Sequence, residues 1–134
     1  MKLLLDTHIA LWYALNDRRL PQKAKDLIRS SDNNTYCSIV SAWEVAIKHS
    51  LKAAEIPFSD EKFCEYARRF DGGLLALDER HIALLKTLRL APDAKEHRDP
   101  FDRMLICQAK AEGMRLLTHD ALLAGYGEPC VFLV

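Results

Sequence analysis

The sequence predicts a single α/β domain with a parallel sheet, and three features of its 134 residues support this fold class. Short apolar runs typical of buried strands alternate with amphipathic stretches typical of helices, as in a parallel sheet with crossover helices. The first run, residues 2–6, is apolar without alternation, as in strands that are covered on both faces. The chain is long enough to bury one sizeable core, and no repeat or linker divides it.

The first half of the chain is expected to form two strands and four helices. Residues 2–6 and 35–40 are the expected strands, because both runs are apolar, β-branched or aromatic. Helices are expected where apolar residues recur every three or four positions, and Pro21 suits the first position of one of them. These helices are expected at residues 7–15, 21–31, 41–52 and 59–70.

The second half is expected to add three strands and three helices. Asp78 is expected to cap a helix that runs to about residue 90, and the charged stretch 91–99 is expected to be irregular. A helix follows from Pro100, since proline is favoured in the first turn. The remaining elements are strands at 74–77, 114–118 and 131–134, and helices at 100–113 and 120–125.

Acidic residues follow strands or lie early on helices at several places in this pattern. Asp6 follows the first strand, Asp120 follows the strand 114–118, Glu44 lies within the helix 41–52, and Asp99 and Asp102 begin the helix 100–113. The carboxyl ends of parallel strands meet at one edge, where open sheets bind ligands. Carboxylates brought together there cannot all stay ionised without a cation, and oxygen ligands favour Mg²⁺ or Mn²⁺. We therefore expect a metal-dependent enzyme that acts on phosphate esters.

Each of these acids also has a purely structural interpretation. Asp6, Asp99 and Asp120 are placed to cap helices, and an acid in the first turn of a helix suits its dipole. Glu44 could form an ordinary surface ion pair with Lys48, four residues further on. If the residues around Glu44 are buried, however, its carboxylate needs a partner. The two interpretations are compatible, with Asp99 capping the helix and Asp102 binding metal.

Composition excludes several other classes of protein. The 19 basic and 19 acidic residues argue against a simple basic nucleic-acid-binding module. If the five acids named above are left out, however, 19 basic and 14 acidic residues remain, a net charge of +5. The four cysteines form no closely spaced pair, so zinc and redox motifs are absent and a reducing cytoplasm is expected. No apolar run is long enough to span a membrane. The histidines show no zinc-binding spacing, and Trp12 and Trp43 are expected in the core or at a subunit interface.

Four segments resemble the PIN-domain ribonucleases, and specifically the VapC toxins of type II toxin–antitoxin pairs. They are LLLDTHIALW at 3–12, SIVSAWEVAIK at 38–48, HRDPFDRMLICQA at 97–109 and LLTHD at 116–120. The resemblance implies one PIN domain over residues 1–134, with a Rossmann-like parallel sheet flanked by helices. It also implies an acidic site with a hydroxyl residue, Thr118, beside the last acid. The catalytic and metal-binding acids implied are Asp6, Glu44, Asp102 and Asp120, with Asp99 as an additional metal-binding acid.

The function implied is metal-dependent hydrolysis of RNA phosphodiester bonds. One or two Mg²⁺ or Mn²⁺ ions would activate water and polarise the phosphate, with Thr118, Lys48 and Arg103 as expected substrate contacts. His119 stands where many relatives carry Arg or Asn, so the resemblance does not define the substrate contacts at this edge of the pocket. The implied partners are a small VapB-like antitoxin, which inserts a segment near the acidic pocket, and a second copy of the chain.

Two alternatives are left open. One is a PIN nuclease that processes RNA without an antitoxin. The other is a non-catalytic binding or signalling module built around the acidic pocket. A phosphoacceptor receiver domain and an Asp-x-Asp phosphatase are disfavoured, because Thr7 and His8 stand where each would have a further acid after the first strand.

Overall fold

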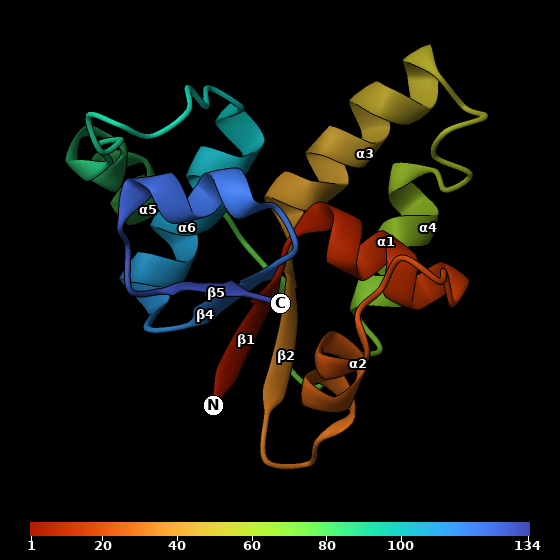
Figure 1. Ribbon diagram of the computed structural model, residues 1–134. Helices are drawn as coiled ribbons and strands as arrows, with labels where there is room; N and C mark the ends of the chain where they lie inside the picture. The colour runs from red at the N-terminus through yellow and green to blue at the C-terminus, as the bar shows by residue number, and fades with distance from the viewer.

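Five parallel strands form the centre of the molecule, in a computed structural model that describes residues 1–134 (Figure 1). Their order across the sheet is β3-β2-β1-β4-β5. The predicted parallel α/β sheet is therefore confirmed. The strands are β1 (Lys2–Leu5), β2 (Asn34–Ser38), β3 (Gly73–Leu75), β4 (Arg115–Thr118) and β5 (Val131–Leu133).

Helices cover both faces of this sheet. Figure 1 shows α1, α2 and α4 on one side and α5 and α6 on the other, while α3 continues from the end of β2 and projects beyond the sheet. None of the helices is both long enough and apolar enough to cross a lipid bilayer. The helices are α1 (Thr7–Leu15), α2 (Gln22–Arg29), α3 (Ile39–Leu51), α4 (Asp60–Ala67), α5 (Glu79–Ala83) and α6 (Pro100–Glu112), with short 3₁₀ helices η1 (Leu84–Thr87) and η2 (Ala121–Tyr126).

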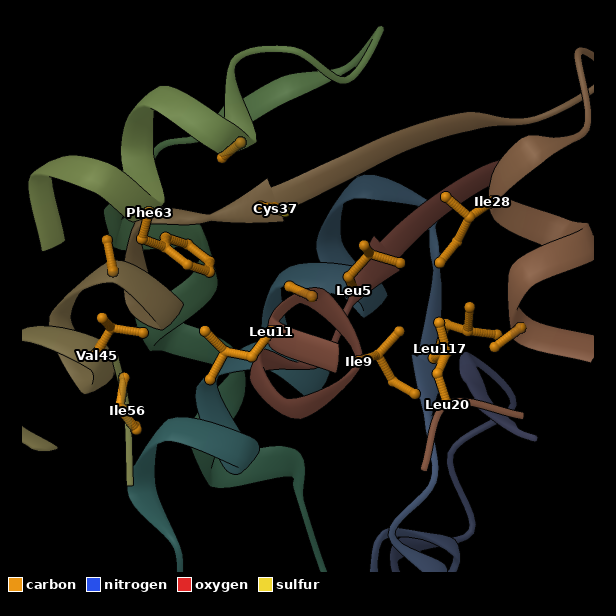
Figure 2. Packing of buried hydrophobic residues seen from close by; sticks show 14 residues of the cluster. Leu5, Ile9, Leu11, Leu20, Ile28, Cys37, Val45, Ile56, Phe63 and Leu117 are labelled. Carbon is orange, nitrogen blue, oxygen red and sulfur yellow. The ribbon is translucent and has the colours of Figure 1, made fainter. Parts of the chain in front are cut away.

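The sheet separates two hydrophobic cores. Neighbouring residues on a strand point to opposite faces, so Leu5 and Leu117 pack against α1, α2 and α4, whereas Leu4 and Leu116 pack against α6. In Figure 2, α1 lies in the middle of the first core, with Leu5 and Leu117 from the strands close to it. Burial on both faces explains why these strands are apolar without alternation.

Several element boundaries differ from the sequence prediction: the expected helix 59–70 ends at Ala67, for example, and the expected helix 120–125 is the 3₁₀ helix η2. Two of the differences have a cause that the structure shows. The expected strand 35–40 ends at Ser38, because the Ser38 hydroxyl accepts a hydrogen bond from the Val40 amide at 2.9 Å and caps α3 two residues earlier than expected. The expected helix 78–90 ends at Ala83 and continues as η1. Tertiary contacts explain this second difference, since Leu88 is buried in the second core and Lys110 of α6 donates a hydrogen bond to Thr87.

The order of the strands reverses between β1 and β4. From β1 the chain builds outwards through β2 and β3, whereas β4 and β5 lie on the other side of β1. Leu5 pairs with Leu117, and the Asp6 amide donates to the Leu117 carbonyl at 3.0 Å. Asp6 and Thr118 therefore leave the sheet side by side at this switch point, which is where open α/β sheets bind ligands.

Candidate metal centre

Asp6 is a buried carboxylate at the end of β1. It occupies the N-cap position of α1, but its side chain makes no capping hydrogen bond, so the capping interpretation is wrong for this residue. Its Oδ2 accepts a hydrogen bond from the Thr118 hydroxyl at 2.7 Å, and its Oδ1 is buried without any partner. Burial raises the pKa of Asp6, and the nearby charge of Glu44 adds to this although the Thr118 hydrogen bond opposes it.

Thr118 connects two of the predicted acids. Its hydroxyl donates to Asp6 and also accepts a hydrogen bond from the Asp120 amide at 3.1 Å. Asp120 in turn caps η2, because its Oδ1 accepts from the Leu122 amide at 2.9 Å. The capping interpretation is therefore correct for Asp120, and its second carboxylate oxygen is left for other contacts. Thr118 is fully buried, so its position holds Asp6 and Asp120 together.

Glu44 reaches the same place from α3. Only 2% of its surface is exposed, its Oε2 is ion-paired with Lys48, and its Oε1 is buried without a partner. Burial alone would lower the pKa of Lys48, but the hydrogen bond and charge of Glu44 and the charges of two further acids raise it. Of the neighbours expected to surround Glu44, Val45 is buried, but Trp43 is 57% exposed. Trp43 is therefore not a core residue: it is exposed on α3 and makes an edge contact with Phe101. The other expected place for it, a subunit interface, stays a prediction.

Asp102 lies on the first turn of α6 and is the acid most affected by the others. Burial raises its pKa to about 8, together with the charges of Asp6, Asp99, Glu44 and Asp120, in that order. One carboxylate oxygen of Asp102, one of Asp120 and a ring nitrogen of His97 all lie within 4.8 Å of one another. Because the charges of Asp6, Glu44 and Asp120 all act on Asp102, the four acids predicted from the sequence lie around one site.

Asp99 begins α6 as its N-cap. Its Oδ1 accepts hydrogen bonds from the amides of Phe101 at 2.8 Å and Asp102 at 3.1 Å. Only its Oδ2 is left for an ion, and its charge acts on Asp102 and Lys48 across the site. Capping is therefore one role of Asp99, and metal binding stays a prediction.

His97 also belongs to the site, although the sequence did not predict it there. Its Nε2 lies 3.0 Å from Asp102 Oδ2, and its Nδ1 lies 2.9 Å from the Tyr126 hydroxyl, which also donates to the His97 carbonyl at 2.9 Å. His97 and Tyr126 are both buried. The histidine lies five residues before Asp102 in an irregular segment, so no helical spacing links the two; only its place at the start of the matching segment 97–109 marks it.

Arg103 is a predicted substrate contact for which the structure shows no contact with the acidic site. It forms no ion pair and lines neither of the two cavities beside the acids. Its positive charge acts instead on Tyr126, whose pKa is raised mainly by burial. Lys48, in contrast, lies at the edge of the acidic site, where its ammonium group is partly exposed.

The donor atoms at this site suit a hard divalent cation. Asp6 Oδ1 and Glu44 Oε1 are buried carboxylate oxygens without a hydrogen-bond partner, and leaving such charge uncompensated is costly. Apart from His97, the groups around this site are carboxylates, whose oxygens are the donors that Mg²⁺ and Mn²⁺ prefer. The residues therefore fit a metal ion of this class.

Comparisons with known proteins identify the fold and the family of the chain. VapBC2 from Rickettsia felis, solved with a DNA fragment from its promoter, matches with a TM-score of 0.66 and 14% identity over 100% of this chain and 98% of that one. FitAcB from Neisseria gonorrhoeae matches with a TM-score of 0.57 and 19% identity over 92% of this chain and 89% of that one. At such identities these structures support the fold alone, and no curated protein sequence matches the chain. The model of the PIN domain matches residues 3–128, nearly the whole chain, so this protein belongs to the PIN domain family.

Proposed function

We propose that this PIN domain is a VapC-like toxin, a metal-dependent endoribonuclease that is paired with an antitoxin. The observation that carries the proposal is the convergence of four carboxylates, two of which have buried oxygens without a partner. The family match over residues 3–128 and the similarity to VapBC2 and FitAcB support it. Such a site suits phosphodiester hydrolysis better than nucleophilic catalysis, because no Ser/His or Cys/His pair lies among its residues.

The acids Asp6, Glu44, Asp102 and Asp120 would hold one or two Mg²⁺ or Mn²⁺ ions, with Asp99 as an additional candidate ligand. A bound ion of this kind polarises a phosphate and lowers the pKa of a coordinated water molecule. The protein would contribute position and charge.

Two further residues have proposed roles beside the acids. Thr118 would keep one oxygen of Asp6 in place through its 2.7 Å hydrogen bond. Lys48 would bring a positive charge to the phosphate of the substrate, since its ammonium group is partly exposed next to Glu44. Substrate contacts by Thr118 and Arg103 stay predictions.

A groove next to the site supports the proposed antitoxin partner. It measures about 500 Å³ and has Glu44 and Lys48 in its wall. Its apolar residues come from α1 and from the loop after α3 and include Leu11, Leu15 and Ile56. An antitoxin segment in this groove would lie against the acidic site.

Four free cysteines suit a reducing compartment, and we expect the protein in the cytoplasm.

A homodimer is the second proposed assembly. The outer face of α3 carries four exposed apolar residues at intervals of four, so they form one stripe along the helix. Exposed apolar surface of this kind is typical of protein–protein contacts. The stripe consists of Ile39, Trp43, Ile47 and Leu51.

Replacing single acids tests the ribonuclease directly. We expect Asp6→Asn and Asp102→Asn to lower Mn²⁺-dependent RNA cleavage by more than about 100-fold. Replacing a residue that only supports a metal ligand typically lowers metal affinity or activity about 10- to 100-fold, and these two residues are proposed to bind the metal themselves. Thermal unfolding of each variant checks that it is folded. Asp32→Asn, which changes an exposed loop acid, is the matched control and should cleave normally. Full activity in both site variants would contradict the assignment.

The same preparation separates the two alternatives. A non-catalytic module would bind neither Mn²⁺ nor Mg²⁺ at the acids and would cleave no RNA. A processing nuclease without an antitoxin would cleave RNA, but no small protein encoded beside it would inhibit the cleavage. We expect inhibition by such a protein and relief when the apolar groove is blocked by substitution.

A further inference from the structure

A second, smaller cavity lies directly beside the acids, and its other walls are aromatic. It measures about 240 Å³ and is lined by Asp6, His8, Trp12, His119 and Asp120. Two of these residues are proposed metal ligands, and the other three carry aromatic rings. The cavity is therefore continuous with the proposed catalytic site.

The three rings form one wall. The ring centroids of His8 and Trp12 are 6.0 Å apart at an angle of 53°, and those of Trp12 and His119 are 5.9 Å apart at 67°. His119 is held by a hydrogen bond between its Nδ1 and the Val134 carbonyl. The guanidinium of Arg19 lies 5.2 Å from the centroid of the Trp12 ring. Aromatic and guanidinium planes of this kind are the groups on which bases of single-stranded RNA stack.

We propose that this aromatic cavity binds the base of a nucleotide next to the scissile phosphate of single-stranded RNA. The inference rests on the proposed function, because the acids locate the phosphate and the cavity begins at two of them. A nucleotide whose phosphate lies at Asp6 and Asp120 places its base within reach of Trp12. The cavity is smaller than the 300–1,000 Å³ typical of drug-sized ligands, which suits a single ring system.

The lining favours a base over a side chain of a protein partner. Trp12 and His8 line both cavities, but Trp12 is the only apolar residue of the smaller one, whereas five of the twelve residues in the neighbouring 500 Å³ groove are hydrophobic. An apolar peptide segment therefore suits the larger groove. Stacking depends on the π-face that every base has, so this site should tolerate all four bases.

Cleavage of RNA with and without the base tests the proposal. In Mn²⁺, Trp12→Leu should lower kcat/KM for a short single-stranded RNA roughly 5- to 150-fold, which corresponds to the stacking energy of one base. Leucine keeps apolar packing but cannot stack, and Trp12→Phe should restore most of the activity. Tyr13→Leu, the same kind of change one position further along α1, is the matched control.

The abasic substrate makes the test specific. We place an abasic nucleotide on either side of the cleavage site in turn. At one of the two positions the abasic nucleotide should lower the activity of the parent protein as much as Trp12→Leu lowers it on the intact RNA. The same abasic nucleotide should not lower the activity of Trp12→Leu further, because the two changes remove the same contact. Equal activity of the parent and Trp12→Leu, or losses that add, would overturn the base site. Loss of antitoxin binding by Trp12→Leu without loss of cleavage would also overturn the base site, since Trp12 lines the larger groove as well.

A binding measurement separates this inference from the proposed function. Trp43→Phe leaves Trp12 as the only tryptophan, and a cleavage-resistant 2′-O-methyl RNA should quench its fluorescence in Mn²⁺. If the 2′-O-methyl RNA quenches the fluorescence but the parent protein does not cleave the same RNA without the methyl groups, the base site is supported and the proposed ribonuclease is contradicted. Cleavage without quenching, and without an effect of Trp12→Leu, would do the reverse.

Discussion

Asp102 is in an unfavourable position for a charge. Its pKa is about 8, raised first by burial and then by four neighbouring carboxylates. In the metal-free protein it is therefore protonated at neutral pH, whereas the unfolded chain ionises it near the ordinary value of 3.8. The folded state binds the extra proton, so stability is present at low pH and is lost as the pH rises towards about 8.

Asp102→Asn should remove this dependence. Asparagine has nearly the same shape and carries no charge, so the metal-free variant should melt at least about 2 °C above the parent at roughly pH 9. Below the unfolded pKa the two proteins should differ much less. Thermal unfolding in chelator across this pH range measures the effect. Parallel curves for the two proteins would show that Asp102 is ionised in the metal-free fold.

His97 is the residue whose side chain contacts Asp102 directly. His97→Ala would leave Asp102 Oδ2 without its 3.0 Å contact, and we expect Mn²⁺ affinity to fall about 10- to 100-fold, as for other residues that support a metal ligand. Tyr126→Phe, which removes the hydroxyl contacts to His97 Nδ1 and to the His97 carbonyl but leaves the contact to Asp102, should have a smaller effect. Calorimetric titration with Mn²⁺ gives both values, and an unchanged affinity in His97→Ala would rule out a supporting role.

At the scale of elements, the start of α6 combines a cap with an acidic site. Pro100 in the first turn, the Asp99 cap and Asp102 are all good helix-starting residues. The same turn brings Asp102 to the carboxyl edge of the sheet. Helix formation and site formation therefore require the same residues here, which explains why the sequence supports both interpretations.

Two substitutions of Asp99 separate capping from metal binding. Asp99→Ala should lower the free energy of unfolding by about 1 kcal/mol, because the two amides capped by Oδ1 lose their acceptor. Asn is as good an N-cap as Asp, so Asp99→Asn should keep the stability. If Asp99 also binds metal, Asp99→Asn should weaken Mn²⁺ binding. Urea unfolding and Mn²⁺ titration of both variants measure the two roles, and normal affinity in Asp99→Asn would limit Asp99 to capping.

Helix α3 has two faces with different purposes. Glu44 and Val45 face inward, while the stripe of Ile39, Trp43, Ile47 and Leu51 faces solvent. If the stripe is a dimer interface, replacing Trp43 and Leu51 together by Ser should convert a dimer to a monomer in sedimentation experiments. Ile82→Ser on α5, another exposed apolar residue, is the control and should leave the dimer intact. A parent that sediments as a monomer would contradict the dimer.

At the scale of the whole molecule, the acidic site opposes folding until a cation is bound. Mutual repulsion and burial raise the pKa of Asp6 and Asp102, so a bound divalent ion should stabilise the fold. At 100 times its dissociation constant a ligand contributes about 2.7 kcal/mol, which corresponds to a rise in Tm of roughly 5–10 °C. Thermal unfolding with Mn²⁺ measures the shift, and Asp6→Asn with Glu44→Gln should abolish it. An equal shift in that double variant would locate the ion elsewhere.

The sequence by itself determined most of the fold and the identity of the four acids. Apolar runs, proline positions and capping residues act locally, so the strands and most helices follow from them. The acids were recognisable because each lies at a strand end or on an early helical turn, in an order that resembles a known family. The early end of α5 is an exception, where contacts with α6 outweigh local preference.

Only the tertiary structure decided which residues surround the acids. Thr118 and Asp6 are 112 residues apart, and they meet because β4 pairs with β1. Local patterns do not specify that pairing, since the order of parallel strands depends on how the crossover helices pack. For the same reason the support of Asp102 by His97, the exposure of Trp43 and the position of Trp12 beside Asp6 became apparent only in the folded chain.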